Sequence, residues 1–91
     1  MNDIEYRSIL CKAICTYGKE AQTLMFFEEV AELEKELCKN ARGKQNRDEI
    51  LEEVADVEIM LEQIKIMHAL NVGAIERVKA QKVQRLNERL S

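Results

Sequence analysis

Proline is absent from this chain of 91 residues, and glycine occurs only three times. These two residue types most often interrupt helices and build the tight turns between strands. A chain almost without them can form long helices but offers few positions for the turns of a sheet. The sequence therefore predicts an all-α protein.

The spacing of apolar residues predicts four helices. Apolar residues recur every three or four positions in segments of about 2–18, 19–40 and 46–70, and again from Gly73 to the C-terminus. Asn2 with Glu5 and Asn46 with Glu49 resemble capping boxes at the starts of the first and third segments. Short connections between four helices predict a mostly antiparallel four-helix bundle, formed by one domain over residues 1–91.

The size of the chain predicts self-association. A domain this small leaves roughly a third or more of its unfolded surface exposed, so contact between copies would bury more. In the third segment Leu51, Ala55, Ile59 and Ile66 fall outside the main apolar stripe, which makes this helix apolar on more than one side. We therefore expect a homo-oligomer.

The composition argues against a membrane, a nucleic acid or zinc as a partner. No run of about 18 apolar residues occurs, and the start MNDIEYRS lacks the apolar core of a secretion signal, so a cytoplasmic protein is expected. A net charge of −3 and 4% aromatic residues give no basic, aromatic surface for nucleic acid. Three cysteines without a CxxC pair, beside one histidine, predict reduced thiols.

Two acidic motifs are the candidate site. The second segment carries EEVAE, with Glu29 and Glu32 three residues apart, and the third carries EEVAD, with Glu53 and Asp56 at the same spacing. Residues three apart share one face of a helix, so each pair can converge on one ion. Glutamate-rich surface helices are common, but a helical wheel places Glu53 and Asp56 beside apolar Met60. Carboxylates in such a setting need a metal, a base or a proton as compensation.

The last segment is basic on its apolar side. The wheel groups four cations with Ile75, Val78, Leu86 and Leu90, and these cations are Lys79, Lys82, Arg85 and Arg89. Long cationic side chains can extend past a core to solvent, or they can contact phosphate oxygens or the acidic cluster. The sequence leaves both interpretations open, and the same holds for Arg42, Lys44 and Arg47 in the basic loop.

The order EExxE, spacer, ExxD resembles that of the MazG-like all-α nucleoside triphosphate pyrophosphohydrolases, and the similarity extends from Gly18 to Arg89. The resemblance implies a MazG-like bundle, completed as a dimer or tetramer, that hydrolyses a (d)NTP to (d)NMP and pyrophosphate. It implies Mg²⁺, for which Mn²⁺ can substitute, and a role in nucleotide-pool sanitation. Met25 stands where phosphoribosyl-ATP pyrophosphatases usually have lysine, whereas the dUTPase branch stays open.

Each candidate residue receives an expected role. The metal ligands and catalytic residues are expected to be Glu29, Glu32, Glu53 and Asp56, with Glu29 or Glu32 as the general base. Substrate binding is expected of Lys82, Arg85, Arg89 and Gln22, although Gln22 can equally pack in the core. The outer-shell candidates are Glu28 and Glu36.

Two other classes of protein also use acidic residues on helices. Ferritin-like di-iron bundles require ExxH motifs on two helices, but the single His68 has Lys65 three positions before it. A non-catalytic assembly or regulatory module would instead pair the acids with the cations of the last helix. Stabilisation of the fold by Mg²⁺ separates the metal site from this module, because a network of ion pairs should gain little stability from Mg²⁺.

Overall fold

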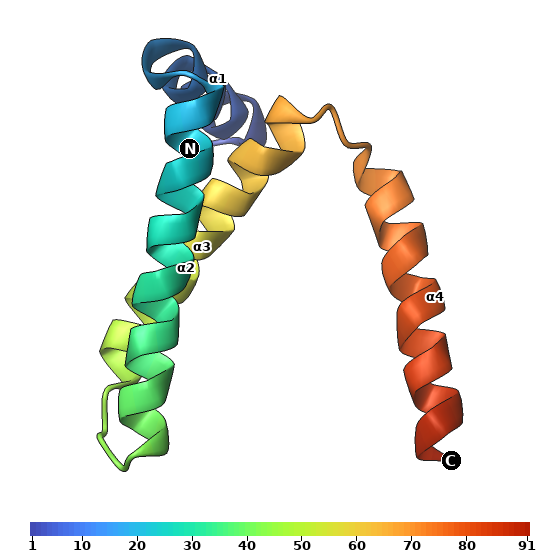
Figure 1. The fold of residues 1–91 in the computed structure, drawn as a ribbon. Helices are drawn as coiled ribbons and strands as arrows, with labels where there is room; N and C mark the ends of the chain where they lie inside the picture. The colour runs from blue at the N-terminus through green and yellow to red at the C-terminus, as the bar shows by residue number, and fades with distance from the viewer.

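A computed structural model describes all 91 residues, which form four α-helices and no strand (Figure 1). The helices are α1 (Asp3–Tyr17), α2 (Lys19–Ala41), α3 (Arg47–Met67) and α4 (Val72–Leu90). The predicted all-α fold with four helices is confirmed. The boundary that differs most is the end of α3, because this helix stops at Met67 rather than near Leu70, and Ala69 takes a left-handed φ of 51°. None of the helices combines the length and the apolar character needed to cross a bilayer.

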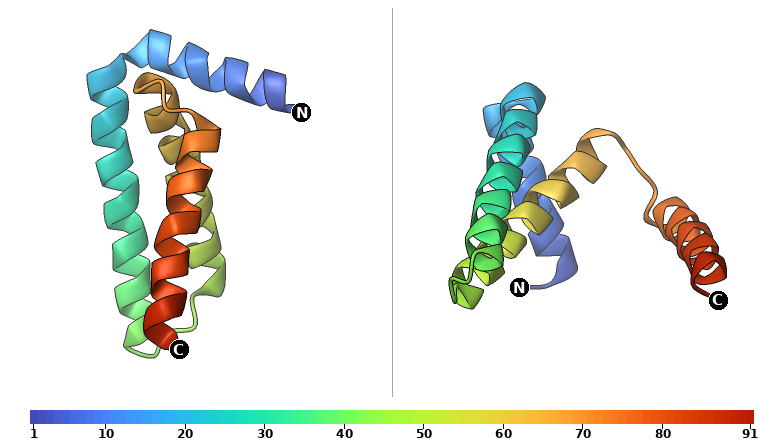
Figure 2. Two further views of the ribbon diagram at one scale, coloured as in Figure 1. Left: turned by 90° about the vertical axis from the view of Figure 1, so that its right-hand side faces the viewer. Right: turned by 60° about the horizontal axis from the view of Figure 1, so that its bottom comes forward.

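The packed part of the molecule consists of α1, α2 and α3. The helices α2 and α3 lie side by side and antiparallel, and α1 runs crosswise at one end of this pair and contacts both (Figures 1 and 2). The buried apolar side chains are Leu10 and Ile14 of α1 and Met60 of α3. Because one chain buries only these three, many other apolar side chains stay exposed.

Asparagines stand before three of the helices, but only two of them cap a helix with the side chain. Asn2 and Asn71 each accept a hydrogen bond from the backbone N–H three residues further on, at 2.8 and 3.0 Å. The capping predicted for Asn46 with Glu49 is wrong, because the Asn46 side chain makes no capping bond. Asn46 is buried, and its amide donates instead to Glu36, in the last third of α2.

The fourth helix stands apart from the rest of its own chain. No Cα atom of α4 lies within 8 Å of another helix, and no α4 residue is buried (Figures 1 and 2). The antiparallel four-helix bundle is therefore not closed within one chain. The connection after α3 directs α4 away, and Val78 and Leu86 on its apolar stripe are 47% and 45% exposed.

Candidate metal centre

Three polar layers cross the interface between α2 and α3. On α2 the polar residues of these layers are seven positions apart: Gln22, Glu29 and Glu36. Seven residues make about two helical turns, so these side chains leave α2 on one face. In the same order, α3 contributes Gln63 and then Asp56 with Glu53, and Asn46, the residue directly before α3, completes the last layer. The outer layers contain amides, whereas the middle layer contains only carboxylates.

The outer layers satisfy their hydrogen bonds within the chain. Gln22 Nε2 donates to Gln63 Oε1 at 2.7 Å, and both side chains are buried. At the other end, Asn46 Nδ2 donates to the backbone oxygen of Glu36 at 2.8 Å and to its Oε1 at 3.0 Å. Hydrogen bonds from Asn46, and then from Lys39, lower the pKa of the Glu36 carboxyl, so that this buried group stays charged.

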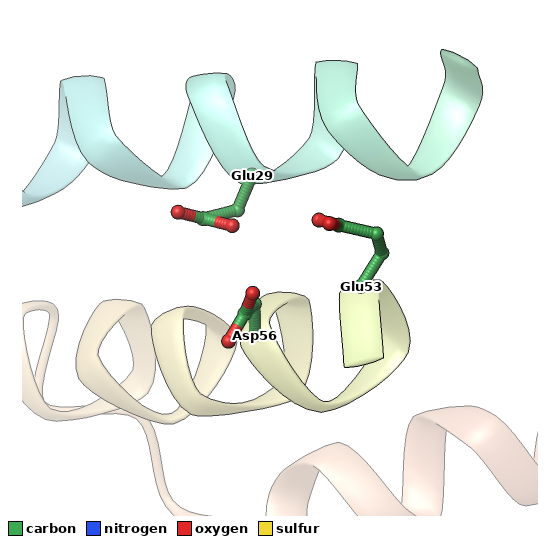
Figure 3. A group of neighbouring side chains, drawn as sticks. All are labelled: Glu29, Glu53 and Asp56. Atoms are coloured by element: carbon green, nitrogen blue, oxygen red, sulfur yellow. The ribbon is translucent and has the colours of Figure 1, made fainter. Parts of the chain in front are cut away.

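The middle layer brings three carboxylates together. One carboxylate oxygen from each of Glu29, Glu53 and Asp56 lies within 4.8 Å of the other two. Glu29 reaches down from α2, while Glu53 and Asp56 rise from successive turns of α3 (Figure 3). The predicted i, i+3 pair on α3 therefore meets one acid of the α2 pair across the helix interface. We call Glu29, Glu53 and Asp56 the acidic triad.

The ionised form of the triad is unfavourable in the absence of a cation. Partial burial raises the pKa of Glu29, and the negative charges of Asp56 and Glu53 raise it further. Burial likewise raises the pKa of Glu53, followed by the charges of Asp56 and Glu32. These shifts have one physical meaning: removing carboxylates from water and placing like charges together both disfavour the ionised form. A cation between the three carboxylates would favour their ionised form and so offset the influence of burial and of the like charges.

No group of the chain provides that cation. The three ion pairs of the molecule each lie within one helix, and none involves a triad residue. Glu53 Oε2 is buried and has no hydrogen-bond partner at all. A set of hard carboxylate oxygens with one unpaired member fits Mg²⁺ or Mn²⁺, which prefer oxygen ligands. The acid-cation network of the non-catalytic alternative does not form within one chain.

The other predicted acids lie around the triad. Glu32 is exposed and stands outside it, although its charge contributes to the raised pKa of both Glu29 and Glu53. Glu36 occupies the neighbouring layer, two turns from Glu29 on the same face of α2. Glu28 is exposed and makes no ion pair. The structure thus brings together three of the four predicted ligands and leaves the fourth close by.

The residues predicted to bind substrate do not gather at the triad within one chain. Lys82, Arg85 and Arg89 lie on α4, where they line a shallow hollow together with Glu88. Gln22 is buried and bonded to Gln63, as its packing interpretation requires, and a nucleoside contact by Gln22 stays a prediction. Any meeting of the α4 cations with this triad therefore requires another copy or a movement of α4.

Sequence reasoning missed Gln63 and Asn46 as members of this interface. Asn46 was interpreted as a capping residue, and Gln63 drew no attention beside the acids. The signal that would have found them is their spacing, because Asn46 precedes Glu53 by seven residues and Gln63 follows Asp56 by seven. Such spacing repeats a helical face after about two turns.

A helical architecture does not by itself specify an activity, because one fold hosts many unrelated functions. The chemistry open to this chain therefore depends on the acidic triad and the residues around it. Comparison with protein-family models, with curated proteins and with solved structures finds no match for this chain.

Proposed function

We propose that this protein is a Mg²⁺-dependent nucleoside triphosphate pyrophosphohydrolase, which converts a (d)NTP to (d)NMP and pyrophosphate. The observation that carries the proposal is the acidic triad, in which three carboxylates from two facing helices lie close together. One buried carboxylate oxygen of Glu53 has no hydrogen-bond partner there. The order of the motifs EEVAE and EEVAD supports the same reaction through the family resemblance. Nucleotide-pool sanitation is the physiological role that the resemblance suggests.

The triad residues would hold Mg²⁺ or Mn²⁺, with Glu32 beside them. When bound, the metal supplies positive charge to phosphate oxygens and to the reacting phosphoryl group. Without such charge, the acids would repel a triphosphate. Through the metal, the triad would hold the phosphate groups of the substrate at a fixed position relative to α2 and α3, and a fixed orientation of the reactants lowers the barrier.

The attacking water needs a base, and Glu32 suits that role better than Glu29. Glu29 is committed to the triad, whereas the exposed carboxylate of Glu32 stands outside it, within electrostatic reach. Glu32 takes the proton of the water as the water oxygen bonds to the attacked phosphorus. The bond from that phosphorus to the α–β bridging oxygen breaks, and its electron pair leaves on the bridging oxygen.

The proposal includes a homo-oligomer in which α4 of one copy covers the α2–α3 pair of another. Val78 and Leu86 leave an apolar stripe on α4 without a neighbour, and a hollow of about 750 Å³ opens between α1, α3 and the start of α4. The basic residues of α4 are Arg77, Lys79, Lys82, Arg85 and Arg89. Because α2 and α3 are strongly acidic, this arrangement joins opposite charges and supplies Lys82 and Arg85 for phosphate.

A substrate screen with the intact protein tests the function. Canonical and modified (d)NTPs are incubated with Mg²⁺, with Mn²⁺ and with EDTA, and the products are resolved by ion-exchange chromatography. We expect (d)NMP and pyrophosphate in equal amounts from at least one substrate, and no turnover in EDTA. NDP and orthophosphate as the first products, or full turnover in EDTA, would contradict the proposal.

A further inference from the structure

The turn between α2 and α3 is closed by the most buried side chain of the molecule. Asn46 is 1% exposed, and all polar atoms of its amide are used. Its Nδ2 donates to the backbone oxygen and to Oε1 of Glu36, at 2.8 and 3.0 Å, and its Oδ1 accepts from Asn40 Nδ2 at 3.3 Å. Its backbone oxygen accepts the N–H of Ile50 and so begins the hydrogen bonding of α3. The first residue before α3 is thus attached directly to the backbone of α2.

We infer that Asn46 is a positioning residue of the metal centre, which sets the register of α3 on α2 and thereby holds Glu53 and Asp56 against Glu29. The inference rests on the proposed metal site. From the bond between Asn46 and Glu36, each helix runs about two turns to the triad, reaching Glu53 on α3 and Glu29 on α2. A slip of one residue moves a helical position by about 1.5 Å and rotates it by about 100°. Such a slip would separate oxygens that now lie within 4.8 Å.

The opposite polar layer is the natural comparison, because it lies equally far from the triad. Gln22 and Gln63 are also two turns from Glu29 and Asp56, and they are also buried. Their single hydrogen bond joins the ends of two long side chains, whose several rotatable bonds let the helices shift while the bond persists. The Asn46 amide is short, and one of its bonds ends on a backbone oxygen, so it transmits the position of α2 to α3 directly.

Metal binding by the intact protein tests the inference, with Mn²⁺ as the probe in isothermal titration calorimetry and without nucleotide. We expect Asn46→Ala to weaken Mn²⁺ binding at least about tenfold, as is usual when a group that orients metal ligands is lost. The matched variant Gln63→Ala, which removes the other buried interhelical bond, should leave binding within about twofold of the parent. Melting curves in EDTA define a temperature at which every variant is folded, and all titrations are made there.

Two further variants separate register from charge. Glu36→Gln removes the negative charge but keeps a side-chain oxygen and the backbone oxygen as acceptors for Asn46, so Mn²⁺ binding should persist. Asn40→Ala removes the bond onto Asn46 Oδ1 and a second bond from Asn40 Nδ2 to the backbone oxygen of Lys44, but it keeps both bonds between Asn46 and Glu36. It should weaken binding less than Asn46→Ala but in the same direction. This milder variant decides the matter if Asn46→Ala does not fold.

The outcomes distinguish this inference from the proposed function. If the parent binds Mn²⁺ and the Asn46 and Asn40 variants bind it equally well, the positioning role is wrong while the metal site stands. Equal weakening by Gln63→Ala or by Glu36→Gln would also overturn it, since general destabilisation or the Glu36 charge would then explain the effect. A parent that binds no Mn²⁺ overturns both the metal site and the inference.

Discussion

The α2–α3 pair and α4 differ in charge and in packing. The pair is acidic, its helices pack along their length, and the hydrogen bonds of its two outer polar layers join them. In contrast, α4 is basic, has no Cα atom within 8 Å of another helix and contains no buried residue. One chain therefore completes the placement of the carboxylates but not that of the cations. If the protein acts on phosphate anhydrides, metal binding belongs to the pair, and phosphate binding by α4 depends on assembly. The two should be separable by mutation.

The acidic side of this comparison gives the largest expected effect. Glu53→Gln keeps the shape of the side chain but removes a ligand charge, so turnover with Mg²⁺ should fall on the order of a thousandfold. The same variant should be at least as stable as the parent in EDTA, because it relieves repulsion with Asp56 and gives the buried position a hydrogen-bond donor. Pyrophosphate release and thermal melts in EDTA measure the two effects.

The control for this variant is Glu58→Gln, on the same helix but outside the triad. It should retain activity within about twofold and respond to Mg²⁺ as the parent does. If Glu53→Gln instead hydrolyses nucleotide at the parent rate and melts earlier in EDTA, Glu53 is a structural acid and the site assignment fails.

The placement of α4 supports a second prediction, about association. Leu86→Asp puts a charge in the middle of the apolar stripe, and burying that charge in an interface is costly, so the dissociation constant of the oligomer should rise on the order of a hundredfold. Gln84→Asp adds the same charge on the opposite face of α4 and should change little. Light scattering across micromolar concentrations measures both. A parent that stays monomeric throughout this range would contradict the oligomer.

Much of the fold was predictable because its causes are local. Few glycines, no proline and regular apolar spacing specified four helices, and the i, i+3 acids on α3 were correctly placed on one face. The position of α4 was not predictable in this way. A helical wheel shows which side of a helix is apolar, but it does not show whether its own chain or another copy covers that side.

The role of Asn46 was missed for a related reason. Its pattern with Glu49 satisfies a local capping rule, whereas its actual partner, Glu36, lies ten residues earlier on another helix. Glu32 shows the same limit: it follows Glu29 at the same spacing that brings Glu53 and Asp56 together on α3, yet it stands outside the triad. Motif membership therefore predicted the region of the site better than it predicted each contact.

The basic side of the comparison gives a smaller effect than the acidic side. Lys82→Ala should raise KM for nucleotide about tenfold, as expected for loss of one charged hydrogen bond, while Mn²⁺ affinity stays unchanged. Arg77→Ala removes a cation from the opposite side of α4 and serves as the control. Steady-state kinetics and calorimetry separate the two quantities. A loss of Mn²⁺ affinity in Lys82→Ala would show that α4 takes part in metal binding. Metal binding could then no longer be assigned to α2 and α3 alone.

The smallest effect concerns the metal-free triad and its response to pH. Burial, and then the charges of Asp56 and Glu32, raise the pKa of Glu53 above its ordinary value of 4.5. The folded protein thus keeps a proton that the unfolded chain loses near that value, so this carboxyl stabilises the fold at acidic pH, and the stabilisation is lost as pH rises through the folded pKa.

This linkage predicts a sign that can be measured against Glu53→Gln, which cannot titrate. In EDTA at about pH 4 the parent and the variant should melt at similar temperatures, because the parent carboxyl is largely neutral in both states. Towards about pH 7 the parent should lose stability relative to the variant, by a small amount because water partly screens the triad. Saturating Mn²⁺ should reverse the difference at neutral pH, since the ion binds the folded parent more tightly than the variant. A difference in Tm that stays constant from acidic to neutral pH would mean that water fully screens the carboxylates of the triad. The α2–α3 pair would then not hold the closely coupled carboxylates that distinguish it from α4.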